Sequence, residues 1–154
     1  MKYIIFEGMS CVGKTGAIVR LANHLVDRDF IRIYGDEIPS PGENKDFQCI
    51  LQNKEERVVA ICSASDDENI IKENRAFLEK ADKKIDFTIM SCRDEQNLHD
   101  CLYKNFNIVS TDLILTIPLA KITRRKEGKL RSIKWYQTLI DNLSVYLFNK
   151  LYAD

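Results

Sequence analysis

Short apolar runs alternate with segments of helical periodicity along most of the chain. Five runs have the length and composition of β-strands, and they lie at residues 2–6, 30–34, 57–62, 85–90 and within 108–117. The run at 57–62 is almost continuously apolar, which is typical of a strand buried on both faces. The pattern therefore predicts five short strands, at least one of them covered on both sides.

Helical periodicity fills the intervals between these runs. Apolar residues recur at helical spacing over 15–28, 63–82, around 98–102 and from Ile133 to Leu151, and a further short helix is expected over 45–53. Alternating strands and helices predict a parallel sheet with helices on both faces. We expect one domain over residues 1–154, with a three-layer α/β/α, doubly wound fold around a mainly parallel five-stranded sheet.

Composition and charge narrow the classes of function. The chain of 154 residues is 45% hydrophobic, and its 23 basic and 23 acidic side chains balance, so no global basic field indicates binding to nucleic acid. No apolar run approaches the roughly 18 residues that span a bilayer. The five scattered cysteines include no CxxC pair that would indicate a zinc site or a disulfide framework. We expect a soluble cytoplasmic protein without a membrane partner.

One motif carries clear chemistry. The residues from Gly8 to Thr15, GMSCVGKT, fit the pattern GxxxxGK[ST] without a mismatch, after a strand and before a helix. The glycines let successive backbone N–H groups converge on an anion, and the helix adds its positive N-terminal dipole. Lys14 can reach the β- and γ-phosphates, and the Thr15 hydroxyl can ligate Mg²⁺. The motif predicts a phosphate-binding loop formed by Gly8, Ser10, Cys11, Val12, Gly13, Lys14, Thr15 and Gly16.

On this motif the chain resembles the P-loop NTPase and kinase superfamily, and we expect the resemblance to cover the whole chain. Members have a doubly wound parallel sheet and bind a Mg–nucleoside triphosphate. The resemblance thus implies ATP, or another nucleoside triphosphate, together with Mg²⁺. Glu7 directly precedes Gly8 in IIFEGMSCVGKT, which looks like the first motif of thymidylate and deoxynucleoside kinases.

A second similarity concerns the loop after the strand at 30–34. YGDEIPSPGE, residues 34–43, resembles the acidic-x-Pro-Gly loop that lines the acceptor pocket of thymidylate kinases. The resemblance implies that Asp36 or Glu37 orients or deprotonates the attacking oxygen of a small acceptor. The alternative is a turn in which Asp, Pro and Gly serve backbone geometry alone.

The strand at 57–62 departs from that family. Thymidylate kinases end their third strand in an Asp-Arg-aromatic motif, whereas this strand ends in AICSASDDE. The resemblance implies that this strand lies beside the strand at 2–6 and that an acid after it reaches Mg²⁺ through water. Asp66 is the first candidate and Asp67 the second. Ser65 and Glu68 also fit a capping box that opens the next helix, and both interpretations can hold together.

Two basic features could contact phosphate. Arg93 follows the strand at 85–90, where it would face the ligand crevice of an open α/β sheet and clamp a phosphate, or else pair with Asp94 or Glu95. The segment 121–134 carries seven Lys or Arg residues. It could be a solvated loop, a lid that closes Arg124 and Arg125 over the phosphates, or a contact for nucleic acid or another anionic partner.

The remaining reactive side chains give weaker signals. Cys11 could be a reactive thiol at a helix N-terminus or a small filler within the loop. His24 and His99 lack Cys or acidic partners at metal-ligand spacing, so we interpret both as structural. A guanine-specific switch is disfavoured, because the chain has no clear NKxD motif.

Three functions are compatible with these features. The first is a small kinase that transfers the γ-phosphate of Mg–ATP to a nucleotide or another small acceptor. The second is an NTPase or nucleotide-dependent switch that acts on a protein partner or a second copy of the chain. The third is a regulatory module that only binds nucleotide. The candidate catalytic residues are Lys14, Asp36, Glu37, Asp66 and Arg93, and the candidate Mg²⁺ ligands are Thr15 and Asp66.

Overall fold

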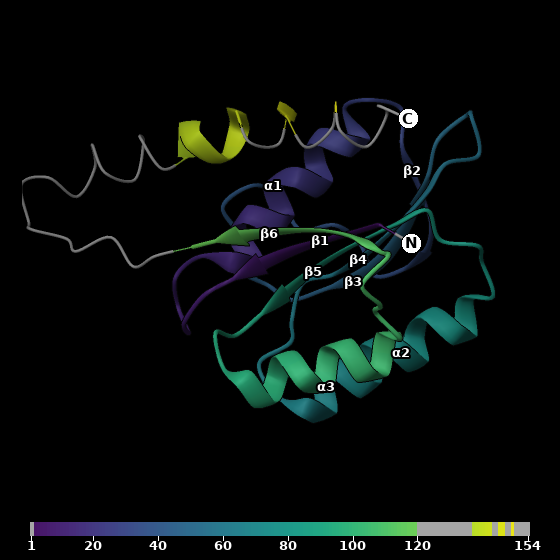
Figure 1. Ribbon diagram of the computed structural model, residues 1–154. Helices are drawn as coiled ribbons and strands as arrows, with labels where there is room; N and C mark the ends of the chain where they lie inside the picture. Colours follow the sequence, from purple (N-terminus) through teal and green to yellow (C-terminus); the bar gives the residue numbers. More distant parts are fainter. Residues whose placement is uncertain (1, 120–136, 143–144, 147–148, 150–154) are drawn as a thin grey trace, which may run out of the picture.

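The chain forms an α/β fold built on one six-stranded sheet (Figure 1). The computed structural model describes residues 2–119, 137–142, 145–146 and 149. The strands are β1 Lys2–Glu7, β2 Ile31–Gly35, β3 Gln48–Gln52, β4 Val58–Cys62, β5 Phe87–Cys92 and β6 Leu113–Pro118. The helices are α1 Lys14–Val26, α2 Glu68–Ala81 and α3 Gln96–Phe106, and residues 137–142 are also helical.

The helices cover both faces of the sheet. α1 and the helical residues 137–142 lie over one face, and α2 and α3 lie over the other (Figure 1). β1 supplies both interfaces, because its side chains alternate in direction. Ile4 and Phe6 pack in the same cluster as α1, whereas Tyr3 and Ile5 pack with α3. The glycine loop (residues 8–15) therefore connects a strand and a helix that are both packed in the core.

The sheet is mixed, which corrects the prediction of a mainly parallel five-stranded sheet. The strand order is β2-β3-β4-β5-β1-β6. β4, β5, β1 and β6 are mutually parallel, whereas β3 runs antiparallel to both of its neighbours, β2 and β4. The predicted α/β class is confirmed. The sheet has one strand more than predicted, namely β3, which lies between β2 and β4 and runs opposite to both.

The inserted strand replaces the short helix expected over 45–53, so that prediction is wrong. Cys49 and Leu51 pack on the α1 side of the sheet, and Ile50 packs on the α2 side. All three side chains are buried. Burial on two opposite faces suits a strand between two partners, and a five-residue element is too short to be stable as an isolated helix.

The position of β4 also differs from the expectation. The resemblance to thymidylate kinases implied that β4 lies directly beside β1, but β5 lies between them. In this order Ile4 of β1 is in register with Ile89 of β5, and Ile89 is in register with Ile61 of β4. Residues that follow β4 therefore reach the glycine loop across the end of β5.

The last part of the chain is only partly described. Ile140 is buried against the cluster that contains α1, and the Arg20 guanidinium donates to Asp141 Oδ1 at 2.6 Å. The basic segment 121–134, with Arg124 and Arg125, lies outside the described residues, as does most of the predicted apolar stripe from Ile133 to Leu151.

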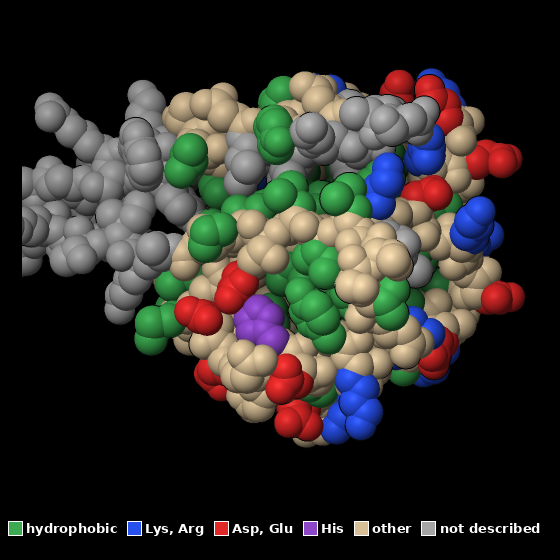
Figure 2. Space-filling model, viewed as in Figure 1, with side chains coloured by type: hydrophobic (Ala, Val, Ile, Leu, Met, Phe, Trp, Pro, Cys, Tyr) green, Lys and Arg blue, Asp and Glu red, His purple; other side chains and the backbone are tan. Residues whose placement is uncertain are grey.

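The visible surface carries mixed charge. Figure 2 shows acidic and basic side chains interspersed on the right of the view, whereas the charged side chains around the histidine on the left are acidic. In the parts of the chain that the structure describes, none of the helices combines the length and the apolar character that crossing a membrane requires.

Candidate functional site

The glycine loop connects the end of β1 to the start of α1. Gly8 and Gly13 have φ angles of 153° and 100°, which side chains rarely permit. A Cβ atom at Gly8 would lie 2.4 Å from the Leu119 carbonyl oxygen, so the backbone beside β6 leaves no room for a side chain. Gly13 directly precedes the first residue of α1. The loop therefore has the backbone geometry that the sequence motif requires.

Lys14 is buried beneath this loop. Its side chain is 7% exposed, and Nζ donates to the carbonyl oxygens of Gly8 and Met9, both at 2.9 Å. These bonds offset part of the cost of removing an ammonium group from water. Nζ also lies 4.0 Å from Asp66 Oδ1. The only full positive charge within the loop is thus held at its centre.

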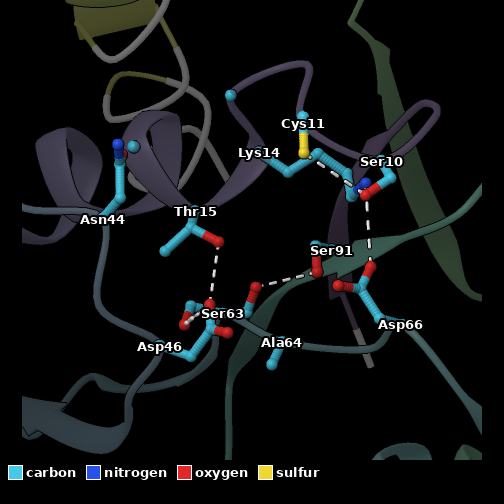
Figure 3. A pocket seen from close by; sticks show the side chains of 12 residues that line it. Ser10, Cys11, Lys14, Thr15, Asn44, Asp46, Ser63, Ala64, Asp66 and Ser91 are labelled. Carbon is cyan, nitrogen blue, oxygen red and sulfur yellow. Dashed lines mark hydrogen bonds and ion pairs between the residues drawn. The ribbon is translucent and has the colours of Figure 1, made fainter.

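A pocket of about 310 Å³ opens in front of the loop (Figure 3). Its walls come from the loop, from the segment before β3, and from the ends of β4 and β5. The residues that line it are Ser10, Cys11, Gly13, Lys14, Thr15, Gly16, Asn44, Asp46, Ser63, Ala64, Asp66 and Ser91. The pocket collects one lysine, two carboxylates and several hydroxyls at the carboxyl ends of parallel strands, where open α/β sheets bind ligands.

Asp46 is the charged residue of the pocket that the sequence did not predict. The Thr15 hydroxyl donates to Asp46 Oδ1 at 2.8 Å, and Ser63 Oγ lies 3.4 Å from the same oxygen (Figure 3). Ser63 Oγ in turn accepts from the Phe47 N–H at 2.8 Å, which ties the segment before β3 to the end of β4. The only sequence signal was an acid directly before an apolar run that was interpreted as a helix.

Asp66, the first of the two acids considered after β4, lines the same pocket as Lys14 and Thr15. It contacts two cations: Arg93 Nε donates to Asp66 Oδ1 at 3.1 Å, and Lys14 Nζ lies 4.0 Å away. Arg93 also lies 3.9 Å from Glu95, so one of its two expected acidic partners is present. Arg93 is not among the residues that line the pocket. Asp66 therefore links the lysine of the loop to the arginine after β5.

Asp67 has a different role. Its side chain accepts from the N–H groups of Asn69 and Ile70 and caps α2. The predicted capping box with Ser65 as the cap is therefore wrong by two residues. Ser65 is buried instead, and its hydroxyl bonds to Ser91. Because its oxygen is committed to the helix, Asp67 is a capping residue and Asp66 is the acid that faces the pocket.

Asp36 and Glu37 do not line the pocket. Asp36 Oδ2 accepts from the Gln48 N–H at 2.9 Å, and the Asp36 N–H donates to the Gln48 carbonyl at 2.7 Å, so this residue closes the connection between β2 and β3. Glu37 is exposed. The same loop does reach the pocket further along, through Asn44 and Asp46. The geometry favours a backbone role for Asp36 itself.

The cysteines differ sharply in accessibility. Cys11 is exposed at the pocket, whereas Cys49, Cys62 and Cys92 are buried. Burial raises the pKa of the Cys49 thiol from 9.0 to about 12. Burial, with a smaller contribution from the Glu7 carboxylate, raises the pKa of Cys92 from 9.0 to about 12. Burial also raises the pKa of Cys62.

The difference in accessibility between Cys11 and the buried cysteines leads to a first prediction. Iodoacetamide at pH 8.5 should label Cys11 at least about tenfold faster than the three buried cysteines, because only thiolates that solvent can reach react. Since burial raises the pKa of these thiols, their contribution to folding stability should be constant below about pH 9 and fall above it, as the thiols of the unfolded chain ionise first. Peptide mass spectrometry measures the first effect. Rapid labelling of Cys49 or Cys62 in the native protein would contradict it.

Comparisons of the chain with protein-family models, with curated proteins and with solved structures found no match.

Proposed function

We propose that the chain binds a Mg–nucleoside triphosphate, in the simplest case Mg–ATP, in the glycine loop. We further propose that it is a small phosphotransferase, which moves the γ-phosphate to a nucleotide or another small acceptor. The observation that supports binding most strongly is the convergence of Lys14, Thr15 and two carboxylates on one pocket in front of a helix N-terminus.

The residues present suit the phosphates of such a ligand. Gly13 is followed by the first turn of α1, whose N–H groups have no partner within the helix. Lys14 would exchange its bonds to the Gly8 and Met9 carbonyls for phosphate oxygens. Bound Mg²⁺ would neutralise developing charge on the transferring phosphoryl group, and the side chains around the pocket would orient that group.

Asp46 is the better candidate than Asp66 for holding Mg²⁺. Its oxygen already contacts the Thr15 hydroxyl, the other oxygen ligand that the motif supplies. Asp66 lies between Lys14 and Arg93, where it would position Lys14 for the phosphates while Arg93 holds its carboxylate in place. The predicted metal ligand Thr15 is retained in this proposal, and the predicted role of Asp66 moves from metal binding to positioning.

Matched variants distinguish the two acids. Asp46→Asn should raise the Mg²⁺ concentration that gives half-maximal turnover by about tenfold, equivalent to about 1.4 kcal/mol of lost Mg²⁺ binding. Asp66→Asn should leave this Mg²⁺ requirement nearly unchanged and weaken nucleotide binding instead. Turnover is measured as a function of Mg²⁺ at saturating ATP. A larger Mg²⁺ shift in Asp66→Asn would assign the metal to Asp66.

A second candidate function is an NTPase or nucleotide-dependent switch without a small acceptor. The observation that favours it is that Asp36 bonds to the backbone of the β2–β3 connection, which removes one of the two acids predicted for the acceptor loop. The position of β5 between β4 and β1 is a further departure from the thymidylate kinase pattern.

A phosphate-transfer screen separates these functions. The chain is incubated with Mg²⁺ and ATP labelled at the γ-phosphate, with and without each nucleoside monophosphate. Label transferred to an acceptor supports the phosphotransferase. Release of inorganic phosphate at the same rate without an acceptor would support the NTPase. Nucleotide binding without loss of the γ-phosphate would overturn both and leave a binding module.

A further inference from the structure

A second group of ligand-forming side chains lies at the base of the glycine loop. Glu7, Asp94 and His99 each offer one ligand atom, and these atoms lie within 4.8 Å of one another. They come from the end of β1, from the segment after β5, and from α3. The three residues border a hollow of about 390 Å³ that shares no lining residue with the pocket in front of the loop. Figure 2 shows histidine and acidic side chains together on this face.

Two of the three side chains have rigid supports. Glu7 is the last residue of β1, in register with both β5 and β6, and its carbonyl accepts from the Leu119 N–H at 2.7 Å. His99 lies within α3, and its N–H donates to the Glu95 carbonyl at 3.1 Å. Glu7 Oε1 and His99 Nε2 are 3.1 Å apart, with both side chains less than a quarter exposed. The pair is therefore positioned by secondary structure on both sides.

The ion pairs formed among the described residues do not balance the negative charge of this group. One imidazole can neutralise at most one of the two carboxylates. In the described part of the chain, no lysine or arginine forms an ion pair with Glu7 or Asp94. Arg93, the neighbour of Asp94, pairs with Asp66 and Glu95 instead. A simple histidine–carboxylate ion pair would not need the second acid.

We propose that Glu7, Asp94 and His99 form a site for a divalent transition-metal ion such as Zn²⁺. Two carboxylate oxygens and one imidazole nitrogen suit such an ion, whereas Mg²⁺ prefers oxygen ligands alone. Ligand atoms about 2.1 Å from a tetrahedral Zn²⁺ are about 3.4 Å apart, close to the separation of Glu7 and His99. Three protein ligands leave one position for water. The interpretation of His99 as purely structural is replaced by this proposal.

The proposal does not depend on nucleotide binding, although Glu7 joins the two features. Glu7 directly precedes Gly8, whose N–H donates to the Cys92 carbonyl at 3.2 Å. An ion held by Glu7 and Asp94 would therefore link the ends of β1 and β5 at the base of the glycine loop. Loss of the ion should loosen this junction and lower the melting temperature of the protein.

The test is Co²⁺ binding to the full chain, monitored by visible absorption in excess Mg²⁺. A Cys11→Ser background removes the exposed thiol as a competing ligand. We expect one Co²⁺ per chain, displaced by Zn²⁺, and an affinity at least about tenfold lower in His99→Asn. The only other histidine provides the control: His24 belongs to α1 and lies 3.6 Å from Asp141, and His24→Asn should bind Co²⁺ as the parent does.

Two further variants make the outcome decisive. Asp94→Asn changes an exposed side chain, so it should reduce Co²⁺ affinity without unfolding the protein, even where His99→Asn does. Lys14→Met should bind Co²⁺ normally, which separates this site from the pocket in front of the loop. Absence of Co²⁺ uptake by the parent, or equal affinities of His99→Asn and His24→Asn, would overturn the proposal and leave Glu7 and His99 as an ion pair only.

Discussion

Lys14→Met is expected to weaken Mg–ATP binding by at least about 100-fold. The substitution keeps the buried aliphatic stem and removes the ammonium group, which makes two bonds to the loop and would make bonds to the phosphates. Two hydrogen bonds between the ammonium group and phosphate oxygens would contribute about 1.5–3 kcal/mol each. Their loss is sufficient for this effect. Calorimetric titration of Mg–ATP into parent and variant measures it.

Lys54→Met is the matched control for Lys14→Met. Lys54 is 85% exposed, and its ion pair with Asp29, at 3.8 Å, is also on the surface. Surface pairs of this kind contribute little to stability. The control should therefore bind Mg–ATP as the parent does. If Lys14→Met retains parental affinity and a parental melting temperature, the glycine loop does not bind the phosphates.

Gly8→Ala is expected to have the second large effect, on both stability and binding. The new Cβ would lie 2.4 Å from the Leu119 carbonyl oxygen and 2.9 Å from Val12 Cγ2, in a backbone conformation with φ of 153°. The backbone after β6 or the loop must move. We expect a loss of about 2–4 kcal/mol in the free energy of unfolding, measured by denaturant titration. Because Gly8 also accepts a bond from Lys14, Mg–ATP affinity should fall as well.

Comparison of Gly8→Ala with Gly42→Ala isolates the steric part of this effect. Gly42 also has a positive φ, of 101°, but nothing lies within 4 Å of the added Cβ. This variant should lose only about 1–2 kcal/mol from the backbone conformation and should retain Mg–ATP binding. Equal destabilisation of the two variants would show that the close approach of β6 to the glycine loop contributes nothing.

The glycine loop could be predicted because its signal is local. Gly8, Gly13, Lys14 and Thr15 are close in sequence, and the flanking strand and helix have strong periodicity of their own. The structure places Lys14, Thr15 and Asp66 around one pocket. The motif itself identifies Lys14 and Thr15, and the resemblance to P-loop kinases identifies Asp66 from its place after a strand.

Asp46 and β3 could not be predicted, because both depend on contacts between residues far apart in the chain. Residues 48–52 form a strand because β2 and β4 satisfy their backbone on both sides, and neither partner is visible in a short sequence window. Asp46 contacts Thr15, which is 31 positions away, only once β3 has formed. The strand order is likewise non-local, and the analogy with thymidylate kinases gave the wrong neighbour for β1.

Glu7 and His99 show a related limit. They are 92 positions apart and meet because β5 delivers α3 to the end of β1. Spacing rules for metal ligands examine residues on one turn or one loop, so they find no partner for His99. The pairing of β1 with β5 supplies that partner.

Nucleotide protection of Cys11 tests the central claim most directly. Cys11 is exposed and lines the pocket in which we place the phosphates, whereas Cys101 is partly exposed on α3 and does not line it. Saturating Mg–ATP should slow iodoacetamide labelling of Cys11 by at least about tenfold and leave the rate at Cys101 unchanged, because a bound phosphate chain would cover the thiol. Unchanged labelling of Cys11 at Mg–ATP concentrations that saturate any binding would contradict the account.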